Sequence, residues 1–434
     1  MTPAPDLVDD AHALAGELAD LRHRLHAEPE LGLVLPRTQK KVLAALDGLP
    51  LEVTSGTSST AVTAVLRGGA GRGGEPPDLH VGGQPVVRPR DVPGVPPHTR
   101  GGSSRPVVLL RGDMDALPVE EQVDVPFRSR IPGVMHACGH DLHTAMLVGA
   151  ARVLAARREA LAGDVVFMFQ PGEEGHDGAR HMIEDGVLDA AGARPVAAYA
   201  LHVMSNLTPR GAIASRPGPL MAASDGLFVT VTGRGGHGST PHLARDPVVA
   251  ACDMVTSLQV AMTRSIDAFA PHVLTVGAIH GGTKRNIVPD VVTFEATVRT
   301  FDRAVRSVLI DTAQRVCEGV AAAHGVDVEV RYEAEYPVTV NDEAEAAFAL
   351  GVAEDLFGRG AVVRMPNPIT GSEDFSRILA EVPGAMLFLG ALVDGREPAT
   401  APSNHSPLAA FDDAVLPQGT SLYAALAARR LAQP

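Results

Sequence analysis

Three continuous apolar runs, separated by helical segments, constrain the fold of this chain more than any other feature of its sequence. The runs are Val107–Leu110, Val165–Phe169 and Val196–Val203. They lack the alternation of apolar and polar side chains that marks a half-exposed strand, so we expect strands buried on both faces. Helical patterns lie between them, over Leu142–Leu161 and Ala179–Leu188. This order predicts an α/β fold with a mostly parallel sheet covered by helices on both sides.

The middle of the chain has a different order of elements. We expect four strands there, over Leu227–Thr232, His272–Ile279, Val291–Thr300 and Val326–Glu333. Two helices are expected between them, over Pro247–Thr263 and Asp302–His324. The resulting βαββαβ order is typical of a compact two-layer, ferredoxin-like module.

Helices and a buried strand like those of the α/β part follow this module, with helices expected over Ala344–Phe357 and 409–431 and a strand over Met386–Leu389. A chain of 434 residues is also too long for one ordinary core, so two domains are expected. We therefore predict an α/β domain in two parts, residues 1–221 and 336–434, with an inserted domain over residues 222–335.

Residues 70–106 stand apart, because they hold eight Gly and eight Pro without apolar periodicity. Such a composition predicts a flexible inserted loop. A formal GxGxxG pattern occurs over Gly69–Gly74, but Glu75-Pro76-Pro77 follows it where a dinucleotide site would need a helix. A nucleotide site is therefore not expected there.

Composition excludes several kinds of partner. The chain carries 51 acidic and 37 basic residues, and its net charge of −14 argues against sequence-independent binding to the phosphates of nucleic acids. Its 12 Phe, 4 Tyr and no Trp offer little surface on which bases could stack. No apolar run approaches the roughly 18 residues of a membrane helix, and no secretory signal is recognisable, so we expect a cytoplasmic protein.

Three cysteines are too few for a disulfide framework. Cys252 and Cys317 lie on expected helix faces, and both are predicted to be small buried core residues. Cys138 differs, because His136 and His140 flank it. We therefore expect Cys138 to have a chemical role.

Polar residues follow the apolar strands at the points where they end. Asp113 and Asp115 come after the first strand, Glu173 and Glu174 come after the second, and His202 lies near the end of the third. Because the carboxyl ends of parallel strands meet at one edge of a sheet, these side chains are expected to share one crevice. Arg111 lies at the first strand end as well, and we expect it only to pair with Asp113.

The segment before the helix expected at Leu142 adds further ligand types, with His136, Cys138, His140 and His143 in close succession. Imidazole, thiolate and carboxylate groups together suit Zn²⁺ and similar divalent ions. More than four candidate ligands predict two ions in one site, roughly 3.5–4 Å apart. The role of His143 is open between metal ligand, substrate contact and helix residue.

The pair Glu173 and Glu174 suggests a division of work. One carboxylate can bind metal while its neighbour stays free as the general base for an activated water. Asp115 is the kind of carboxylate that orients a ligating histidine. These observations predict a metal-dependent hydrolytic site.

Several short motifs are spread along the chain. They are RHRLH at 22–26 with PELG at 29–32, DMDALP at 113–118, MHACGHDLH at 135–143, QPGEEG at 170–175, ALHV at 200–203, GHG at 236–238, NIVP at 286–289, GSEDF at 371–375 and NHSP at 404–407. With these motifs, the chain resembles the amidohydrolase branch of the M20 metallopeptidases over nearly its whole length. This branch includes hippurate hydrolases, N-acyl-amino-acid amidohydrolases and auxin-conjugate hydrolases.

The resemblance implies a role for each matching residue. The implied ligands of a two-metal centre, with Zn, Mn or Co as the ions, are Cys138, His140, Glu174, His202 and His405. Glu173 is implied as the general base, and Asp115 as the carboxylate that orients the centre. His405 comes only from the resemblance, since the spacing of the sequence by itself indicates a solvated loop histidine.

The resemblance also implies a phosphorylase/hydrolase-like catalytic domain and an inserted domain that acts as a dimerisation lid. In related enzymes, a histidine at the place of His237 reaches the partner subunit's centre and steadies the oxyanion. Asn286 and Gly371 are implied as substrate-binding residues, and His237 as both catalytic and substrate-binding. A homodimer or homotetramer is expected.

The implied reaction is hydrolysis of an N-acyl or N-aroyl amino acid. A dipeptidase, a deacetylase of amino-acid intermediates and an inactive binding relative remain alternatives, whereas no G-x-S-x-G elbow supports a serine nucleophile. The sequence departs from the usual pattern at Gly175–Gly178, where His176 could add a ligand or contact, at Gly238–Pro241 and in the long 70–106 segment. These departures leave the substrate preference open.

Overall fold

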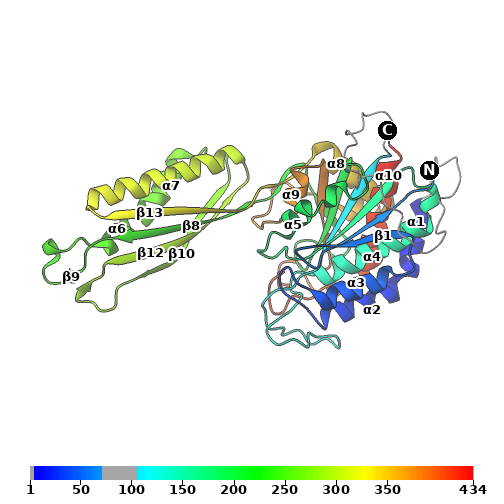
Figure 1. Ribbon diagram of the computed structural model, residues 1–434, viewed down its shortest axis with the longest axis horizontal. Coiled ribbons are helices and arrows are strands. Elements are labelled where there is room, and N and C mark those ends of the chain that lie inside the picture. Colours follow the sequence, from blue (N-terminus) through cyan, green and yellow to red (C-terminus); the bar gives the residue numbers. More distant parts are fainter. Residues whose placement is uncertain (1–3, 71–104, 434) are drawn as a thin grey trace, which may run out of the picture.

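The computed structural model of the protein describes residues 4–70 and 105–433 (Figure 1). Most of the Gly- and Pro-rich segment expected over residues 70–106 therefore lies outside the described residues. Figure 1 shows an elongated molecule in which a larger body, containing both ends of the chain, is joined to a smaller one by extended strands.

The larger body is built on an eight-stranded sheet with the order β1-β2-β4-β3-β5-β16-β6-β15. The strands, in that order, are Leu51–Ser55, Val62–Leu66, Asp164–Gln170, Val107–Asp113, Ala197–Met204, Gly384–Gly390, Ile213–Ser215 and Val362–Arg364. The central strands β4, β3, β5 and β16 run parallel to one another, whereas β1 and β2 add an antiparallel edge beside β4, and β6 pairs antiparallel with β16. The predicted α/β fold with a mostly parallel sheet is thus confirmed.

Helices cover both faces of this sheet, as its apolar strands require. Alternate residues of β4 show the two cores, since Val165 and Phe167 pack into one and Val166 and Met168 into the other. The helices are α1 (Ala4–Ala13), α2 (Ala15–His26), α3 (Pro36–Leu46), α4 (His140–Ala156), α5 (Gly178–Glu184), α8 (Glu343–Phe357), α9 (Ser376–Leu379) and α10 (Leu416–Leu431). Helix α4 begins two residues before the expected start and ends earlier than expected, so its first residue is one of the predicted ligands, His140.

The smaller body, which we call the lid, has the predicted βαββαβ order. Its antiparallel sheet has the strand order β10-β12-β8-β13, formed by His272–Gly281, Val291–Thr300, Ala223–Thr232 and Asp327–Tyr336. Two helices, α6 (Pro247–Ser265) and α7 (Arg303–His324), share a hydrophobic core with this sheet. Asp302 caps α7 by accepting hydrogen bonds from the backbone amides of Ala304 and Val305.

One of the two cysteine predictions for the lid is wrong. Cys317 is buried in the lid core, as expected, but Cys252 is exposed on α6. The inward positions of α6 are Ala250, Ala251 and Met254, so Cys252 falls on the solvent side of the same turn.

The two bodies are joined by a pair of neighbouring segments. The chain enters the lid through β7 (Gly218–Met221) and β8, and it returns through β13 and β14 (Thr339–Asn341). The two crossings lie side by side, since β14 pairs with β7 and β13 pairs with β8. Among the described residues, no helix combines the length and apolar character needed to cross a membrane.

Candidate metal centre

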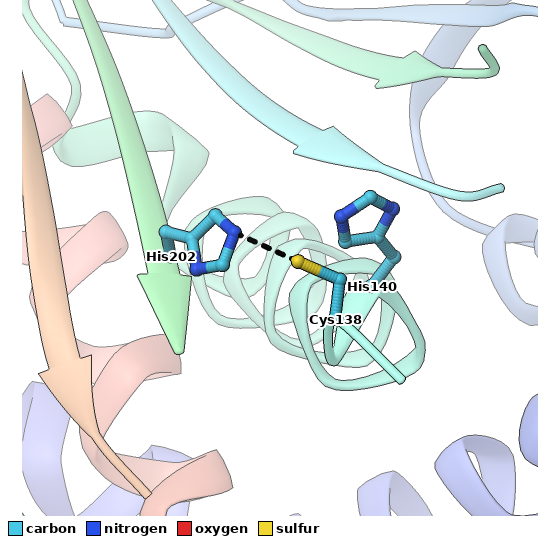
Figure 2. Close-up of side chains that lie close together, drawn as sticks. All are labelled: Cys138, His140 and His202. Carbon is cyan, nitrogen blue, oxygen red and sulfur yellow. Dashed lines mark hydrogen bonds between the residues drawn. The ribbon is translucent and has the colours of Figure 1, made fainter. Parts of the chain in front are cut away.

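The predicted ligands meet at the carboxyl end of the parallel sheet. Figure 2 shows Cys138 and His140, at the start of α4, facing His202 on β5. The Cys138 sulfur lies 3.3 Å from Nε2 of His202. These three donors lie within 4.8 Å of one another and could hold one metal ion.

A second group of donors adjoins the first. Cys138, Glu174 and His405 also offer ligand atoms within 4.8 Å of one another, as do His140, Glu173 and Glu174. His405 Nε2 lies 3.2 Å from the Cys138 sulfur and 3.2 Å from Oε1 of Glu174. The three groups overlap at Cys138, His140 and Glu174, and this arrangement suits two cations bound close together.

Orphaned polar atoms support the presence of metal ions. Both ring nitrogens of His140 are buried without a hydrogen-bond partner among the described residues. Buried imidazole nitrogens normally find partners, because an unsatisfied polar group costs about 1–3 kcal/mol. The thiol, imidazole and carboxylate donors here fit a divalent metal pair, which would satisfy them.

The electrostatics of the centre suit cations as well. Burial by itself would lower the pKa of His140, but Asp113 raises it well above its ordinary value. The carboxylates around His140 thus favour positive charge at this place, as a metal site requires. Burial lowers the pKa of His202 well below its ordinary value, which leaves this imidazole neutral and ready to bind metal.

The neighbouring glutamates differ in their surroundings. Burial raises the pKa of Glu173 well above its ordinary value, and the charges of Glu373 and Glu174 add to this effect. For Glu174, burial acts in the same direction, but the contacts with His405, His140 and Cys138 together outweigh it and lower the pKa. Glu174 is therefore the better anion, whereas Glu173 is the better proton carrier.

Asp115 fixes the turn that carries both glutamates. Its two carboxylate oxygens accept the backbone N–H groups of Glu173 and Glu174, each at 3.0 Å. One of the same oxygens lies 3.5 Å from Nδ1 of His140. Asp115 thus contacts both the ligand helix and the glutamate turn.

Arg111 has more partners than the sequence suggested. It pairs with Asp113 at 2.5 Å, as expected, and its guanidinium also contacts Glu373 at 2.8 Å and Asp374 at 3.0 Å. The side chain is 1% exposed. Arg111 therefore neutralises a buried group of carboxylates next to the metal donors and is not a donor itself.

The remaining histidines of the cluster take different places. His143 uses both ring nitrogens, with Asp113 and with the Val203 amide, which leaves none for a metal ion. His136 is buried, and it belongs to none of the donor groups found among the described residues. His176 is exposed and lies beside Gly32, so within the described chain it adds no ligand.

The lid residues lie away from the centre of their own chain. His237 forms β9 (Gly236–His237), which pairs with β11 (Ile287–Val288) directly after Asn286. Figure 1 places β9 at the end of the lid farthest from the larger body. Gly371 instead lies beside the joint, where its carbonyl accepts the Ala222 N–H at 2.9 Å. The fold thus unites the metal donors but not the predicted substrate contacts.

Sequence reasoning missed two features of the site. Glu373 and Asp374 were noted only as part of a motif, because nothing in their local pattern revealed that Arg111 would meet them. Tyr336 was missed because the last lid strand was expected to end at Glu333, whereas β13 continues to Tyr336. The large side chains of Tyr336 and Val338, which follow the acidic Glu333 and Glu335, could have indicated that the strand continues into a buried region.

Comparison with known proteins decides the family. The sequence profile of peptidase family M20/M25/M40 matches residues 109–429. The chain belongs to the M20 peptidase family. This result confirms the resemblance drawn from the motifs and the expected class of enzyme, a metal-dependent hydrolase of linear amides.

Relatives of this M20 enzyme align along almost the whole chain. Thermostable carboxypeptidase 2 of Saccharolobus solfataricus is 34% identical over 425 residues, which cover 97% of each chain. Hippurate hydrolase of Campylobacter jejuni is 32% identical over 434 residues, which cover 99% of this chain and 100% of the relative. The crystal structure of the Bacillus subtilis YXEP protein, described as a dinuclear metal binding peptidase from the M20 family, matches with a TM-score of 0.76 and 29% identity over 98% of this chain and 100% of that chain.

Proposed function

We propose that this enzyme hydrolyses N-acyl or N-aroyl amino acids to a carboxylic acid and a free amino acid. The observation that carries the proposal is the donor cluster around buried Cys138, His140 and His202, with buried Glu173 beside it, at the carboxyl end of the sheet. The relative named hippurate hydrolase supports this substrate class, because hippurate is an N-aroyl amino acid.

The proposed ligands of the two cations are Cys138, His140, Glu174, His202 and His405. When bound, the cations supply Lewis-acid activation of the amide carbonyl and of the attacking water. The proposed ions are Zn²⁺, Mn²⁺ or Co²⁺, and the thiolate among the ligands favours an ion softer than Mg²⁺, which prefers oxygen ligands.

Glu173 is proposed to move the proton of the reaction. Its carboxylate takes a proton from the attacking water, holds it, and delivers it to the nitrogen of the departing amino acid. Burial among other carboxylates raises the pKa of Glu173, and this environment suits a group that must hold a proton between two steps. Asp115 keeps the Glu173 backbone in place by accepting its N–H.

The lid residues are proposed to act across a dimer. His237 and Asn286 lie together at the far end of the lid, where they cannot serve the centre of their own chain in this arrangement. We propose that His237 donates to the oxyanion in the partner subunit's centre, and that Asn286 and Gly371 contact the substrate. A homodimer satisfies this requirement, as does a homotetramer built from such pairs.

The test is hydrolysis by metal-reconstituted enzyme of hippurate and of acetyl-, long-acyl- and indoleacyl-amino acids. Glu173→Gln should lower kcat by about 10²–10⁴-fold while two metal ions per chain remain bound. Cys138→Ser should lower metal affinity at least about tenfold, whereas Cys252→Ser, on the exposed side of α6, should leave it unchanged. Wild-type turnover by the Glu173→Gln enzyme would disprove the mechanism.

A peptidase activity is the second candidate, and one observation favours it. The relative from Saccharolobus solfataricus is named a carboxypeptidase, and such an enzyme also releases a C-terminal amino acid from an amide. Assays with blocked peptides and with free dipeptides separate the candidates. A carboxypeptidase releases the C-terminal residue of a blocked peptide, a dipeptidase requires the free amine, and the proposed amidohydrolase acts best on simple acyl and aroyl amino acids.

A further inference from the structure

The last strand of the lid ends against the catalytic turn of the larger body. Strand β13 ends at Tyr336, whose side chain is buried, with 7% of its surface exposed. Its hydroxyl donates a hydrogen bond to the backbone carbonyl of Glu173 at 2.7 Å. A residue of the lid thus touches the peptide of the proposed general base.

A bulge in β13 aims this side chain. Ala334 pairs with Asp225 and Tyr336 pairs with Ser224, so Glu335 is an extra residue in the ladder with β8. In a regular strand without the bulge, Tyr336 would point to the same face as Tyr332, because side chains alternate along a strand. The bulge sends it to the opposite face, in keeping with the frequent use of bulges to redirect side chains near active sites.

The peptide of Glu173 is held from two bodies. Asp115, at the end of β3, accepts its N–H at 3.0 Å, and Tyr336 donates to its carbonyl at 2.7 Å. The Tyr336 oxygen also accepts the backbone N–H of Asp177 at 3.3 Å. Burial raises the pKa of the Tyr336 phenol, so the hydroxyl keeps the proton that it donates.

Arg377 provides a second link at the same joint. Its guanidinium contacts both carboxylate oxygens of Asp177, at 3.0 and 2.9 Å, and the carbonyl of Glu335 at 2.7 Å. Asp177 has a φ of +55°, a left-handed backbone conformation that residues other than glycine adopt uncommonly. These contacts hold the turn after Glu174 in an unfavourable backbone conformation and tie it to the end of the lid.

We propose that Tyr336 is a positioning residue that couples the orientation of the lid to the carboxylate of Glu173. The inference rests on the proposed role of Glu173 as general base. A turn that loses its support from the lid retains its metal ligands and its substrate contacts, but the base no longer points at the reacting water. Small errors of this kind lower kcat strongly, since proton transfer depends on geometry.

The test compares Tyr336→Phe with Tyr332→Phe in the full-length, metal-loaded enzyme. Tyr332 is the matched control, because it lies on the same strand and donates a partly buried hydrogen bond to Asp225 at 2.6 Å, within the lid. Tyr336→Phe should lower kcat by about 10–100-fold, with KM and the two bound metal ions unchanged. Tyr332→Phe should lose about as much thermal stability as Tyr336→Phe, but its kcat should stay within about twofold of the wild-type value.

A double variant separates this inference from the proposed function. In the Glu173→Gln background, Tyr336→Phe should have little further effect on kcat, because both changes act through the same carboxylate. Equal kcat values for Tyr336→Phe and Tyr332→Phe, with Glu173→Gln inactive, would overturn the inference and leave the proposed function intact. Full activity of Glu173→Gln would overturn the proposed function itself.

Discussion

Nε2 of His143 accepts a hydrogen bond from the backbone amide of Val203 at 2.7 Å. The other ring nitrogen must then carry the proton, and it lies 2.5 Å from Oδ1 of Asp113. Burial lowers the pKa of His143, which agrees with a neutral ring in this arrangement. His143 therefore joins the end of β3 to the residue after His202 and acts as a structural support of the centre.

Replacement of His143 by alanine should destabilise the protein without loss of a metal ion. The buried Val203 amide loses its acceptor and Asp113 loses a donor, so we expect the free energy of unfolding to fall by about 2–5 kcal/mol. Urea unfolding and metal analysis check this result. His176→Ala is the control, because His176 is exposed and its removal should change stability by less than about 0.5 kcal/mol. Loss of one metal ion at unchanged stability would instead make His143 a ligand.

Metal binding should release a proton from His405. Hydrogen bonds to Cys138 and Glu174 raise the pKa of His405 from 6.5 to about 10 in the metal-free protein. The protonated imidazole stabilises the metal-free fold fully below pH 6.5, and this contribution is lost as the pH rises through about 10. A metal ion must displace that proton, so metal affinity should rise with pH across this window.

Calorimetry at pH 8 in buffers of different ionisation enthalpy counts the protons released. His405→Ala should release about one proton fewer than wild type. His324→Ala is the control, because His324 also contacts a carboxylate, Asp253, at 3.0 Å, but lies in the lid. Equal proton release by wild type and His405→Ala would show that His405 is neutral before metal binds.

Much of the fold followed from local patterns. Continuous apolar runs marked the central strands, and polar residues directly after them marked the catalytic edge, because parallel strands bring their ends together. Cys138, His140, Glu174 and His202 could therefore be grouped from the sequence, whereas His405, from a distant loop with a φ of +70°, needed the family resemblance.

Other features depend on tertiary contacts that no local pattern encodes. The meeting of Arg111 with Glu373 spans 262 positions of the chain, and it depends on how the last third packs against β3. The bulge at Glu335 changes the face of Tyr336 through pairing with β8, and strand periodicity alone predicts the opposite face. Cys252 was placed wrongly because the helix pattern around it allows either side of the same turn.

Removal of the buried Arg111 charge should be among the most destabilising single changes. Arg111→Met leaves Asp113, Glu373 and Asp374 buried without their cation, and the loss of one member of a buried ion pair costs about 3–5 kcal/mol. Chemical denaturation measures the change. Arg194→Ala, which removes the exposed pair with Glu381, should cost no more than about 1 kcal/mol. Similar losses for both variants would contradict the structural role of the Arg111 cluster.

Gly139 separates two predicted ligands, Cys138 and His140, and it has no room for a side chain. Its φ is +88°, and an added Cβ would lie 2.3 Å from a methyl group of Val203. Gly186 is the matched control, because its φ is +89° but an added Cβ meets nothing within 4 Å. Both Gly→Ala changes impose a left-handed alanine, at a cost of about 1–2 kcal/mol, whereas only Gly139→Ala also forces a steric overlap.

Thermal denaturation should therefore show a larger loss of stability for Gly139→Ala than for Gly186→Ala, and metal titration should show weaker binding in the Gly139→Ala variant only. Equal stability and equal metal affinity of the two variants would mean that the start of α4 can shift without disturbing its ligands.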